Sequence, residues 1–492
     1  MNNSVQDLRT ALEQIKAYPG HYIETDVEAD PHLEIAGVYR RVGAGGTIMR
    51  PTTNNGPAMM FNNIKGHPGK RLVIGVLASR KRMGILMDTP HDRLGFLLND
   101  CVNNPTPPVL ADGSVPCQEV VHRADDPCFD VHKIIPVIQT SLDDPGPCIT
   151  MGLCRATDPE TGVTDVTVCR MFLQDGKDEI TILVHPKVTR HIGIMLLKAE
   201  KAGKPLPISV SIGLDPAIYM SCTFTPPATP FGYDELSVAG ALRGRPVELA
   251  KCIAIDGTAI ANAEYVIEGI IHPDVTVKED KLTGKGLALA EFPGYNGKAM
   301  PANVIKIKAI THRANPIYQT LLGPSEEHVT MAGIPTEACI LNMAEKSIPG
   351  FVKNVYCHSA GGGKFMAVMQ VEKTVPQHEG MQRQAALAAF TAFYELKHVF
   401  LVDEDVDPFD STDVFWAMTT RFQGNIDTVF IPGIYQHHVD PSAWPYYSAF
   451  SRTPGASCKT IFDCTVPYEL KEKFIRARFQ DVDVKKFIPD FE

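Results

Sequence analysis

Short apolar stretches separated by turn residues dominate the middle of the chain, from about residue 126 to 320. The predicted strands cover 166–172, 179–184, 207–212, 249–255, 264–271 and 304–311. Several strands at this spacing are typical of a barrel or a sandwich. One helix is predicted among them, from about His191 to Ala202, with Gly203 at the position of a C-cap.

After about residue 325 the pattern alternates between helix-like and strand-like segments. The predicted helices are 336–346, 382–396 and 411–421, and the predicted strands are 352–356, 398–402 and 428–431. This alternation indicates βαβ units and a mainly parallel sheet. The first part of the chain is instead rich in Gly, Pro and Asn, and begins with an amphipathic surface helix that carries Leu8, Leu12 and Ile15. The pattern therefore divides the chain into 1–125, 126–320 and 321–492.

Length and charge narrow the class of protein. A chain of 492 residues is too long for one ordinary core and implies about two to four domains. A formal net charge of −10 argues against a nucleic-acid or anionic-membrane surface, so an anionic ligand must be bound by a local positive site. The 12 cysteines contain no CxxC pair, which favours reduced thiols over a structural zinc or a disulfide scaffold. No apolar run approaches the roughly 20 residues that span a bilayer, so we expect a cytoplasmic protein.

The segment from Asp165 to Arg170, followed by His191 and Glu235, contains the most informative polar residues. Two carboxylates and an imidazole suit a divalent cation such as Mn²⁺, which leaves coordination sites open for phosphate. The Arg170 guanidinium suits a carboxylate or phosphate. The alternative is a half-buried strand with unrelated surface charges. In a regular strand Asp165 and Arg170 would face opposite sides, so Asp165 must lie at a strand end, at a bulge or across the edge of the site.

Four further residues are candidates for proton transfer or ligand binding. Glu291 stands between alanine, phenylalanine and proline, so we expect partial desolvation and a raised pKa, although a solvated loop glutamate is the alternative. His328 and His437 could each orient a phenolic hydroxyl, or could be incidental surface histidines. Lys364 follows three glycines and could meet an anion, or could simply follow a tight turn.

Several dispersed motifs resemble the UbiD family of decarboxylases, which use prenylated flavin mononucleotide. The similar segments, in order, are 57–66, 165–170, 190–193, 213–217, Glu235 with 238–243, Glu291 and 402–408. The likeness is closest to the branch that acts on protocatechuate and gallate, through 43–47, 59–63, 229–233, 291–295 and 457–459. The resemblance covers essentially the whole chain. It implies an α/β multidomain protein, with an N-terminal α/β domain, a central split β-barrel that binds flavin, and a C-terminal α/β domain that supports oligomer formation.

The same resemblance implies the cofactor site. Asp165, His191 and Glu235 would bind Mn²⁺, with K⁺ nearby, and the metal would hold the cofactor phosphate. Many relatives have asparagine at the position of Asp165, and either residue supplies an oxygen. The residues that would contact the flavin are Val168, Cys169, Arg170, Arg190, His191 and Lys364.

The implied reaction is the reversible, non-oxidative decarboxylation of a hydroxylated benzoate to the phenol and CO₂, through a covalent adduct with prenylated flavin mononucleotide. Arg170 would bind the substrate carboxylate, Glu291 would protonate the ring, and His328 and His437 would hold the ring hydroxyls. Cinnamate-type members carry another glutamate five residues before the acid, where this chain has Gly286. A mechanism that needs a linked Glu-Arg-Glu group therefore cannot be transferred whole.

The resemblance also implies partners, and it leaves alternatives open. A flavin prenyltransferase would supply the cofactor, and the protein would be a homo-oligomer, either a dimer or a hexamer, without nucleic-acid or membrane partners. One alternative is a decarboxylase of the 4-hydroxybenzoate or vanillate type. Another is a flavin-binding protein or reductase without decarboxylase activity. A metal-only decarboxylase of the amidohydrolase type is disfavoured, because no HxH pair occurs near the N-terminus.

Overall fold

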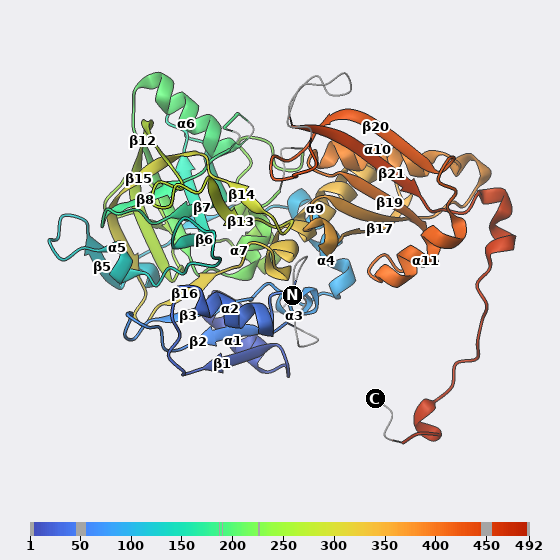
Figure 1. Cartoon of the computed structure of the whole chain (residues 1–492), viewed down its shortest axis with the longest axis horizontal. Helices are drawn as coiled ribbons and strands as arrows, with labels where there is room; N and C mark the ends of the chain where they lie inside the picture. The colour runs from blue at the N-terminus through green and yellow to red at the C-terminus, as the bar shows by residue number, and fades with distance from the viewer. Residues whose placement is uncertain are drawn as a thin grey trace.

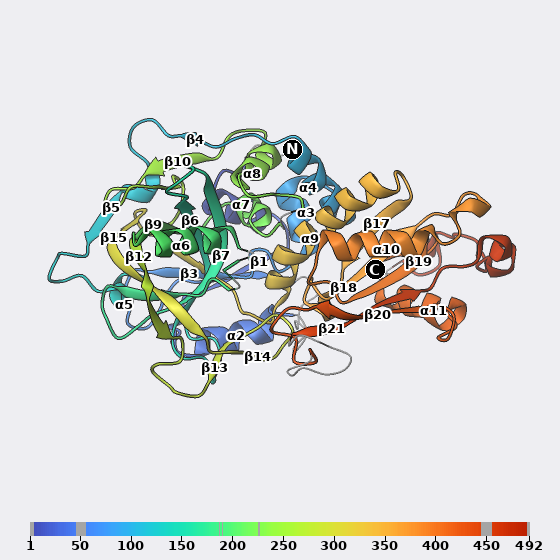
Figure 2. The same ribbon diagram turned by 90° about the horizontal axis from the view of Figure 1, so that it is seen from above.

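The computed structural model describes residues 4–45, 56–185, 187–188, 190–224, 227–443 and 455–489. Gly46 and Thr47, which belong to one of the motifs above, lie outside the described residues. Figures 1 and 2 show an N-terminal region, a central region dominated by strands, and a C-terminal region with a second large sheet. Among the described residues, no helix is long and apolar enough to cross a membrane.

The N-terminal region is a four-stranded sheet with helices packed beside it. Its elements are α1 (Leu8–Lys16), β1 (Tyr22–Thr25), α2 (Glu34–Val42), β2 (Ala58–Phe61), β3 (Arg71–Ile74), α3 (Arg80–Met87), α4 (Leu94–Asn103) and β16 (Ile317–Thr320). The order is β1-β2-β3-β16, so the last strand returns from much later in the chain to pair in parallel with β3. Helix α1 is amphipathic, as predicted, and buries Leu8, Leu12 and Ile15.

The central region is a seven-stranded sheet with antiparallel pairing. Its strands are β5 (Val120–Arg123), β6 (Cys148–Thr157), β7 (Thr164–Phe172), β8 (Glu179–Ile182), β9 (Leu206–Ile212), β12 (Tyr265–Lys278) and β15 (Pro301–His312). The sheet curls on itself, because β8 pairs with β15 and Ile180 also bridges Leu173, just beyond β7. Helix α6 (His191–Ala202) ends at Gly203 in the left-handed conformation, as predicted.

Smaller elements complete this region. The predicted strand at 249–255 forms the shorter β10 (Glu248–Lys251), in a separate sheet with β4 (Val109–Leu110) and β11 (Thr258–Ile260). The hairpin of β13 (Leu287–Ala290) and β14 (Asn296–Lys298) was not predicted. Helices α7 (Pro216–Ser221) and α8 (Leu236–Arg243) follow β9.

The C-terminal region is a five-stranded sheet with three principal helices. Its elements are α9 (Glu326–Ser347), β17 (Val352–Cys357), β18 (Met366–Val371), α10 (Met381–Ala392), β19 (His398–Asp403), α11 (Ser411–Arg421), β20 (Thr428–Tyr435) and β21 (Ala456–Asp463). The prediction of a mainly parallel sheet is wrong. In the order β17-β18-β19-β21-β20, the two inner pairs are parallel and the two outer pairs are antiparallel. The sequence pattern missed β18, which follows β17 after a connection short enough for antiparallel neighbours.

Helix α9 lies at the junction of the three regions (Figure 2), where it packs against α4, α7, α10 and β17. It begins at Glu326, whereas the predicted helix began only after Pro335. Proline removes the N–H that would bond the carbonyl four residues earlier. That carbonyl, of Met331, instead accepts a hydrogen bond of 2.8 Å from the Thr223 hydroxyl. The tertiary contact therefore supplies a partner that the sequence pattern does not reveal.

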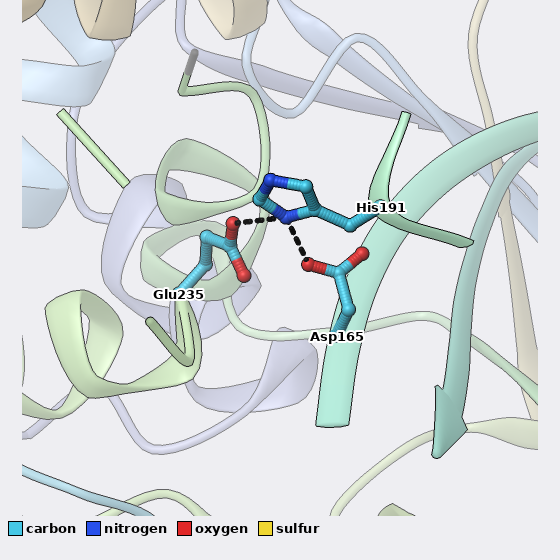
Figure 3. A group of neighbouring side chains, drawn as sticks. All are labelled: Asp165, His191 and Glu235. Carbon is cyan, nitrogen blue, oxygen red and sulfur yellow. Dashed lines mark hydrogen bonds and ion pairs between the residues drawn. The ribbon is translucent and has the colours of Figure 1, made fainter. Parts of the chain in front are cut away.

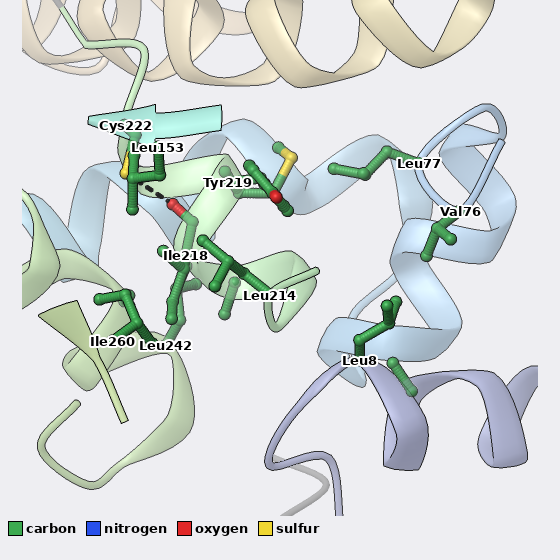
Figure 4. Packing of buried hydrophobic residues seen from close by; sticks show 14 of the residues in the cluster. Leu8, Val76, Leu77, Leu153, Leu214, Ile218, Tyr219, Cys222, Leu242 and Ile260 are labelled. Atoms are coloured by element: carbon green, nitrogen blue, oxygen red, sulfur yellow. Dashed lines mark hydrogen bonds between the residues drawn. The ribbon is translucent and has the colours of Figure 1, made fainter. Parts of the chain in front are cut away.

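One hydrophobic cluster joins the N-terminal and central regions (Figure 4). It includes Leu8 of α1, Leu77 beyond β3, Ile218 of α7, Leu242 of α8 and Ile260 of β11. Buried apolar contacts are the main favourable contribution to folding. Because the two regions share this core, side chains that reach the site from either one are held in a fixed relation.

A buried ion pair between Arg80 and Glu337 connects α3 to α9. The guanidinium donates to both carboxylate oxygens, at 2.8 and 2.6 Å. Arg80→Met would leave the Glu337 carboxylate buried without its charged partner, and we expect the free energy of unfolding to fall by about 3–5 kcal/mol in urea denaturation. Lys65→Met is the control, because it breaks an exposed pair with Asp30 and should barely move the urea midpoint. Equal midpoints for the two variants would contradict the prediction.

Candidate active site

The predicted site residues line one cavity of about 250 Å³. Strand β7, helix α9, the loops of the C-terminal region and the segment before α6 all contribute to its lining. The predicted residues in the lining are Asp165, Val168, Cys169, Arg170, Arg190, His191, Glu235, Glu291, His328, Lys364 and His437. Residues that are far apart in the sequence therefore meet in one place.

Asp165, His191 and Glu235 form a compact group at one end of this cavity (Figure 3). Their ligand atoms lie within 4.8 Å of one another, and His191 Nδ1 lies 2.8 Å from Asp165 Oδ1 and 4.0 Å from Glu235 Oε1. Glu235 Oε2 is buried and has no hydrogen-bond partner among the described residues. Burial raises the pKa of Asp165, and burial together with the Asp165 charge raises the pKa of Glu235 well above its usual value. A bound divalent cation would offset both effects.

The position of Asp165 resolves the problem of strand geometry. Asp165 is the second residue of β7, so it lies at a strand end, one of the predicted possibilities. Arg170 lies toward the other end, where the pairing of β6 with β7 is irregular between Ile149 and Gly152. His191 is the first residue of α6, and Glu235 is the N-cap of α8. Three element ends thus converge on the group.

Arg170 is held between two carboxylates. Its Nε and Nη2 donate to the two oxygens of Glu279 at 2.8 and 2.9 Å, and its Nη1 donates to Glu291 Oε1. The Glu-Arg-Glu arrangement therefore exists although position 286 is glycine, and the expectation that it could not be transferred whole is wrong in this respect. The chain folds back after Glu279, and Asp280 accepts a 2.7 Å hydrogen bond from the Gly286 N–H. Sequence spacing alone could not show this return.

His328 and His437 both contact Phe292, whose ring centroid is 5.5 Å from each imidazole. Burial, together with the nearby Lys364 charge, lowers the pKa of His328 to about 3 and that of His437 well below its usual value. Both rings are therefore neutral at neutral pH. A neutral imidazole offers one donor and one acceptor, which suits hydroxyl binding without adding charge.

The glycine turn before Lys364 directs its side chain into the cavity. Gly362 and Gly363 have φ of 63° and 73°, and a Cβ at Gly362 would lie 2.2 Å from the Phe292 ring. The turn therefore requires glycine. Lys364 Nζ lies 3.9 Å from Glu395 Oε2 and 4.8 Å from the Phe292 ring centroid, and burial lowers the pKa of the ammonium group. The turn and the anion-binding interpretations of this segment are compatible.

Comparison with known proteins identifies the family. Three family models, all of the 3-octaprenyl-4-hydroxybenzoate carboxy-lyase (UbiD), match this chain. The model of the N-terminal domain matches residues 14–101, that of the Rift-related domain 109–325 and that of the C-terminal domain 329–464. A gallate decarboxylase from Lactiplantibacillus plantarum is 50% identical over 486 residues, which covers 98% of this chain and 99% of that protein. The chain belongs to the UbiD family.

Solved structures of UbiD relatives extend this likeness to three dimensions. The apo 3,4-dihydroxybenzoic acid decarboxylase of Klebsiella pneumoniae matches with a TM-score of 0.93 and 52% identity, over 99% of this chain and 100% of that chain. An evolved dimeric form of a UbiD-class enzyme from Pelotomaculum thermopropionicum, in complex with prFMN, matches with a TM-score of 0.81 and 32% identity, over 96% and 97% of the two chains. The predicted α/β multidomain fold is confirmed.

Sequence reasoning missed two acidic residues of this UbiD site. Glu279 follows the last residue of β12, and Glu395 lies between α10 and β19. Neither belongs to a local motif: Glu279 stands among ordinary charged residues, and Glu395 follows two aromatic residues without a recognisable pattern. Only the folded chain shows that Glu279 contacts Arg170 and that Glu395 lines the cavity.

The cluster of Asp165, His191 and Glu235 leads to a prediction about metal binding. In the wild-type protein, Mn²⁺ at about 100 times its dissociation constant should stabilise the folded state by about 2.7 kcal/mol and raise the melting temperature. In Glu235→Gln that increase should be largely lost, because one charged ligand is removed. Differential scanning calorimetry with Mn²⁺ or with EDTA measures the effect. Glu200→Gln, an exposed change on α6, is the control, and an equal Mn²⁺ shift in all three proteins would contradict the prediction.

Proposed function

We propose that this protein catalyses the reversible, non-oxidative decarboxylation of a hydroxylated benzoate of the protocatechuate or gallate type, releasing the phenol and CO₂. The observation that carries the proposal is Arg170, fixed between Glu279 and Glu291 in a cavity that also contains two neutral histidines. The gallate and 3,4-dihydroxybenzoate decarboxylases, similar along their whole length, support this substrate class.

The cofactor in this proposal is prenylated flavin mononucleotide. Loss of CO₂ from an aromatic ring leaves an electron pair that no side chain can delocalise, and the bound cofactor supplies the electron sink. The Oε2 atom of Glu235, which is buried and has no hydrogen-bond partner in the part of the chain that the structure describes, fits a metal that anchors a phosphate. Asp165, His191 and Glu235 would hold Mn²⁺, with K⁺ nearby. The residues assigned to the flavin are Val168, Cys169, Arg170, Arg190, His191 and Lys364.

The side chains divide the remaining work. Arg170 binds the substrate carboxylate through the guanidinium N–H donors that its contacts with Glu279 and Glu291 leave available, since three of its five donors are used in those contacts. Glu291 delivers a proton to the ring carbon that loses CO₂, and Glu279 keeps the guanidinium in place. His328 and His437 bind the ring hydroxyls. The apolar ring of Phe292, which contacts both histidines, keeps water from the substrate ring.

The domain and assembly assignments belong to the same proposal. The domains are 1–125, a split-barrel flavin domain at 126–320, and 321–492, and the curled central sheet supports the barrel. A flavin prenyltransferase supplies the cofactor. None of the 12 cysteines, all of which lie in the described part of the chain, forms a disulfide, which suits the reducing cytoplasm. A homo-oligomer, a dimer or a hexamer, is supported by the extended C-terminal segment, which runs away from the body of the chain (Figure 1) and exposes Ile475, Phe479 and Phe487.

Activity measurements test the proposed function directly. The protein is produced together with a flavin prenyltransferase, purified anaerobically and assayed with a panel of hydroxybenzoates. We expect CO₂ release from protocatechuate or gallate. Glu291→Gln should lower kcat by about 10²–10⁴-fold, the usual contribution of a positioned acid, while the absorption spectrum of the bound flavin stays unchanged.

Glu345→Gln, an exposed change on α9, is the matched control and should retain wild-type turnover. Full activity of Glu291→Gln would remove the proton-transfer role from Glu291. Absence of phenol from every acid in the panel, with the flavin bound, would overturn the proposed function itself.

A further inference from the structure

Glu395 is an acidic residue of the cavity to which the mechanism above gives no role. It is 5% exposed and lines the cavity together with Lys364 and His437. Its Oε1 lies 3.6 Å from His437 Nε2, and its Oε2 lies 3.9 Å from Lys364 Nζ. Both separations are longer than a direct hydrogen bond. A ligand oxygen at about 2.8 Å from each of two such atoms could bridge either gap.

The backbone determines which nitrogen of His437 carries the proton. The Val439 N–H donates to His437 Nδ1 at 3.2 Å, so Nδ1 is an acceptor. Because the ring is neutral, its single proton is on Nε2. The Nε2–H therefore faces the Glu395 carboxylate, and a donor and an acceptor stand side by side. A hydroxyl group can satisfy both, since it accepts from one partner and donates to the other.

His328 carries its proton on the other ring nitrogen, Nδ1. Its Nδ1 lies 2.9 Å from the Gly323 carbonyl oxygen, which can only accept, so Nδ1 carries the proton. Its Nε2 is then a lone-pair acceptor. Lys364, near Glu395, can donate but cannot accept. The cavity thus presents acceptors at His328 and Glu395, and donors at His437 and Lys364.

We propose that Glu395 is a substrate-binding residue that selects a free ring hydroxyl, which donates to its carboxylate while accepting from His437 Nε2–H. The neighbouring ring hydroxyl donates to His328 Nε2. The ligand class is therefore an aromatic ring with two adjacent free hydroxyls, and methyl ethers are excluded because an ether oxygen has no proton to donate. This inference rests on the proposed function for the identity of the ring, and it assigns Glu395 as the acidic group that recognises the hydroxyl groups of that ring.

Binding of the phenol products tests this assignment without requiring turnover. The holoenzyme is titrated calorimetrically with catechol and with its monomethyl ether, 2-methoxyphenol. The wild type should bind catechol at least about 100-fold more tightly, because a site built around a hydroxyl rejects a ligand that lacks one. In Glu395→Gln the amide can donate to the ether oxygen, so this preference should fall at least about tenfold. The kcat/KM ratio of protocatechuate to its two monomethyl ethers should fall in parallel.

Asp403→Asn is the matched control, because Asp403 is a buried carboxylate of the same region that pairs with Arg421 away from the cavity. Its preference for catechol should equal that of the wild type. Glu395→Asp, which keeps the charge, should retain more of the preference than Glu395→Gln and shows whether loss of the carboxylate or loss of folding is responsible. An unchanged preference in Glu395→Gln, or equal binding of both phenols by the wild type, would overturn the inference. Binding as expected without any decarboxylation would overturn only the proposed function.

Discussion

The buried guanidinium of Arg170 is the interaction on which the rest of the site depends. Two carboxylates removed from water are costly unless a cation compensates them, and Arg170 meets both with charge-assisted hydrogen bonds. Glu279 and Glu291 stand at the beginning and the end of the folded-back segment that contains Gly286. The guanidinium therefore fixes that segment against β7 and sets where Glu291 points.

Polar side chains are buried at both ends of the cavity, but their charges are compensated in different ways. At the Asp165 end, two carboxylates and an imidazole are gathered without a lysine or arginine in the group. Burial raises the pKa values of Asp165 and Glu235, and the Asp165 charge raises that of Glu235 further. At the His328 end, burial keeps the imidazoles neutral, and backbone groups determine which nitrogen carries the proton. One end is thus suited to a cation, and the other to neutral hydroxyl groups.

Helix α9 shows how the fold brings these groups together. Its first turn carries His328, its middle tolerates Pro335 because Thr223 supplies a hydrogen bond to Met331, and Glu337 pairs with Arg80 of the N-terminal region. Local preference would begin this helix ten residues too late. The contacts that lengthen it come from segments more than a hundred residues away in the sequence, so the position of His328 is a property of the whole fold.

The sequence pattern missed β5 and β6, but by itself it determined β7, β8, β9, β12 and β15 of the central sheet, helices α1, α6 and α11, and eleven of the residues that line the cavity. These follow from local periodicity, from capping residues and from the motifs shared with the UbiD family. Only the tertiary structure decided the mixed pairing of the C-terminal sheet, the full length of α9, and the presence of Glu279 and Glu395 in the site. The reason is physical. The partner of a strand and the residue that compensates a buried charge depend on which distant segments come into contact, and local sequence patterns do not show which segments do so.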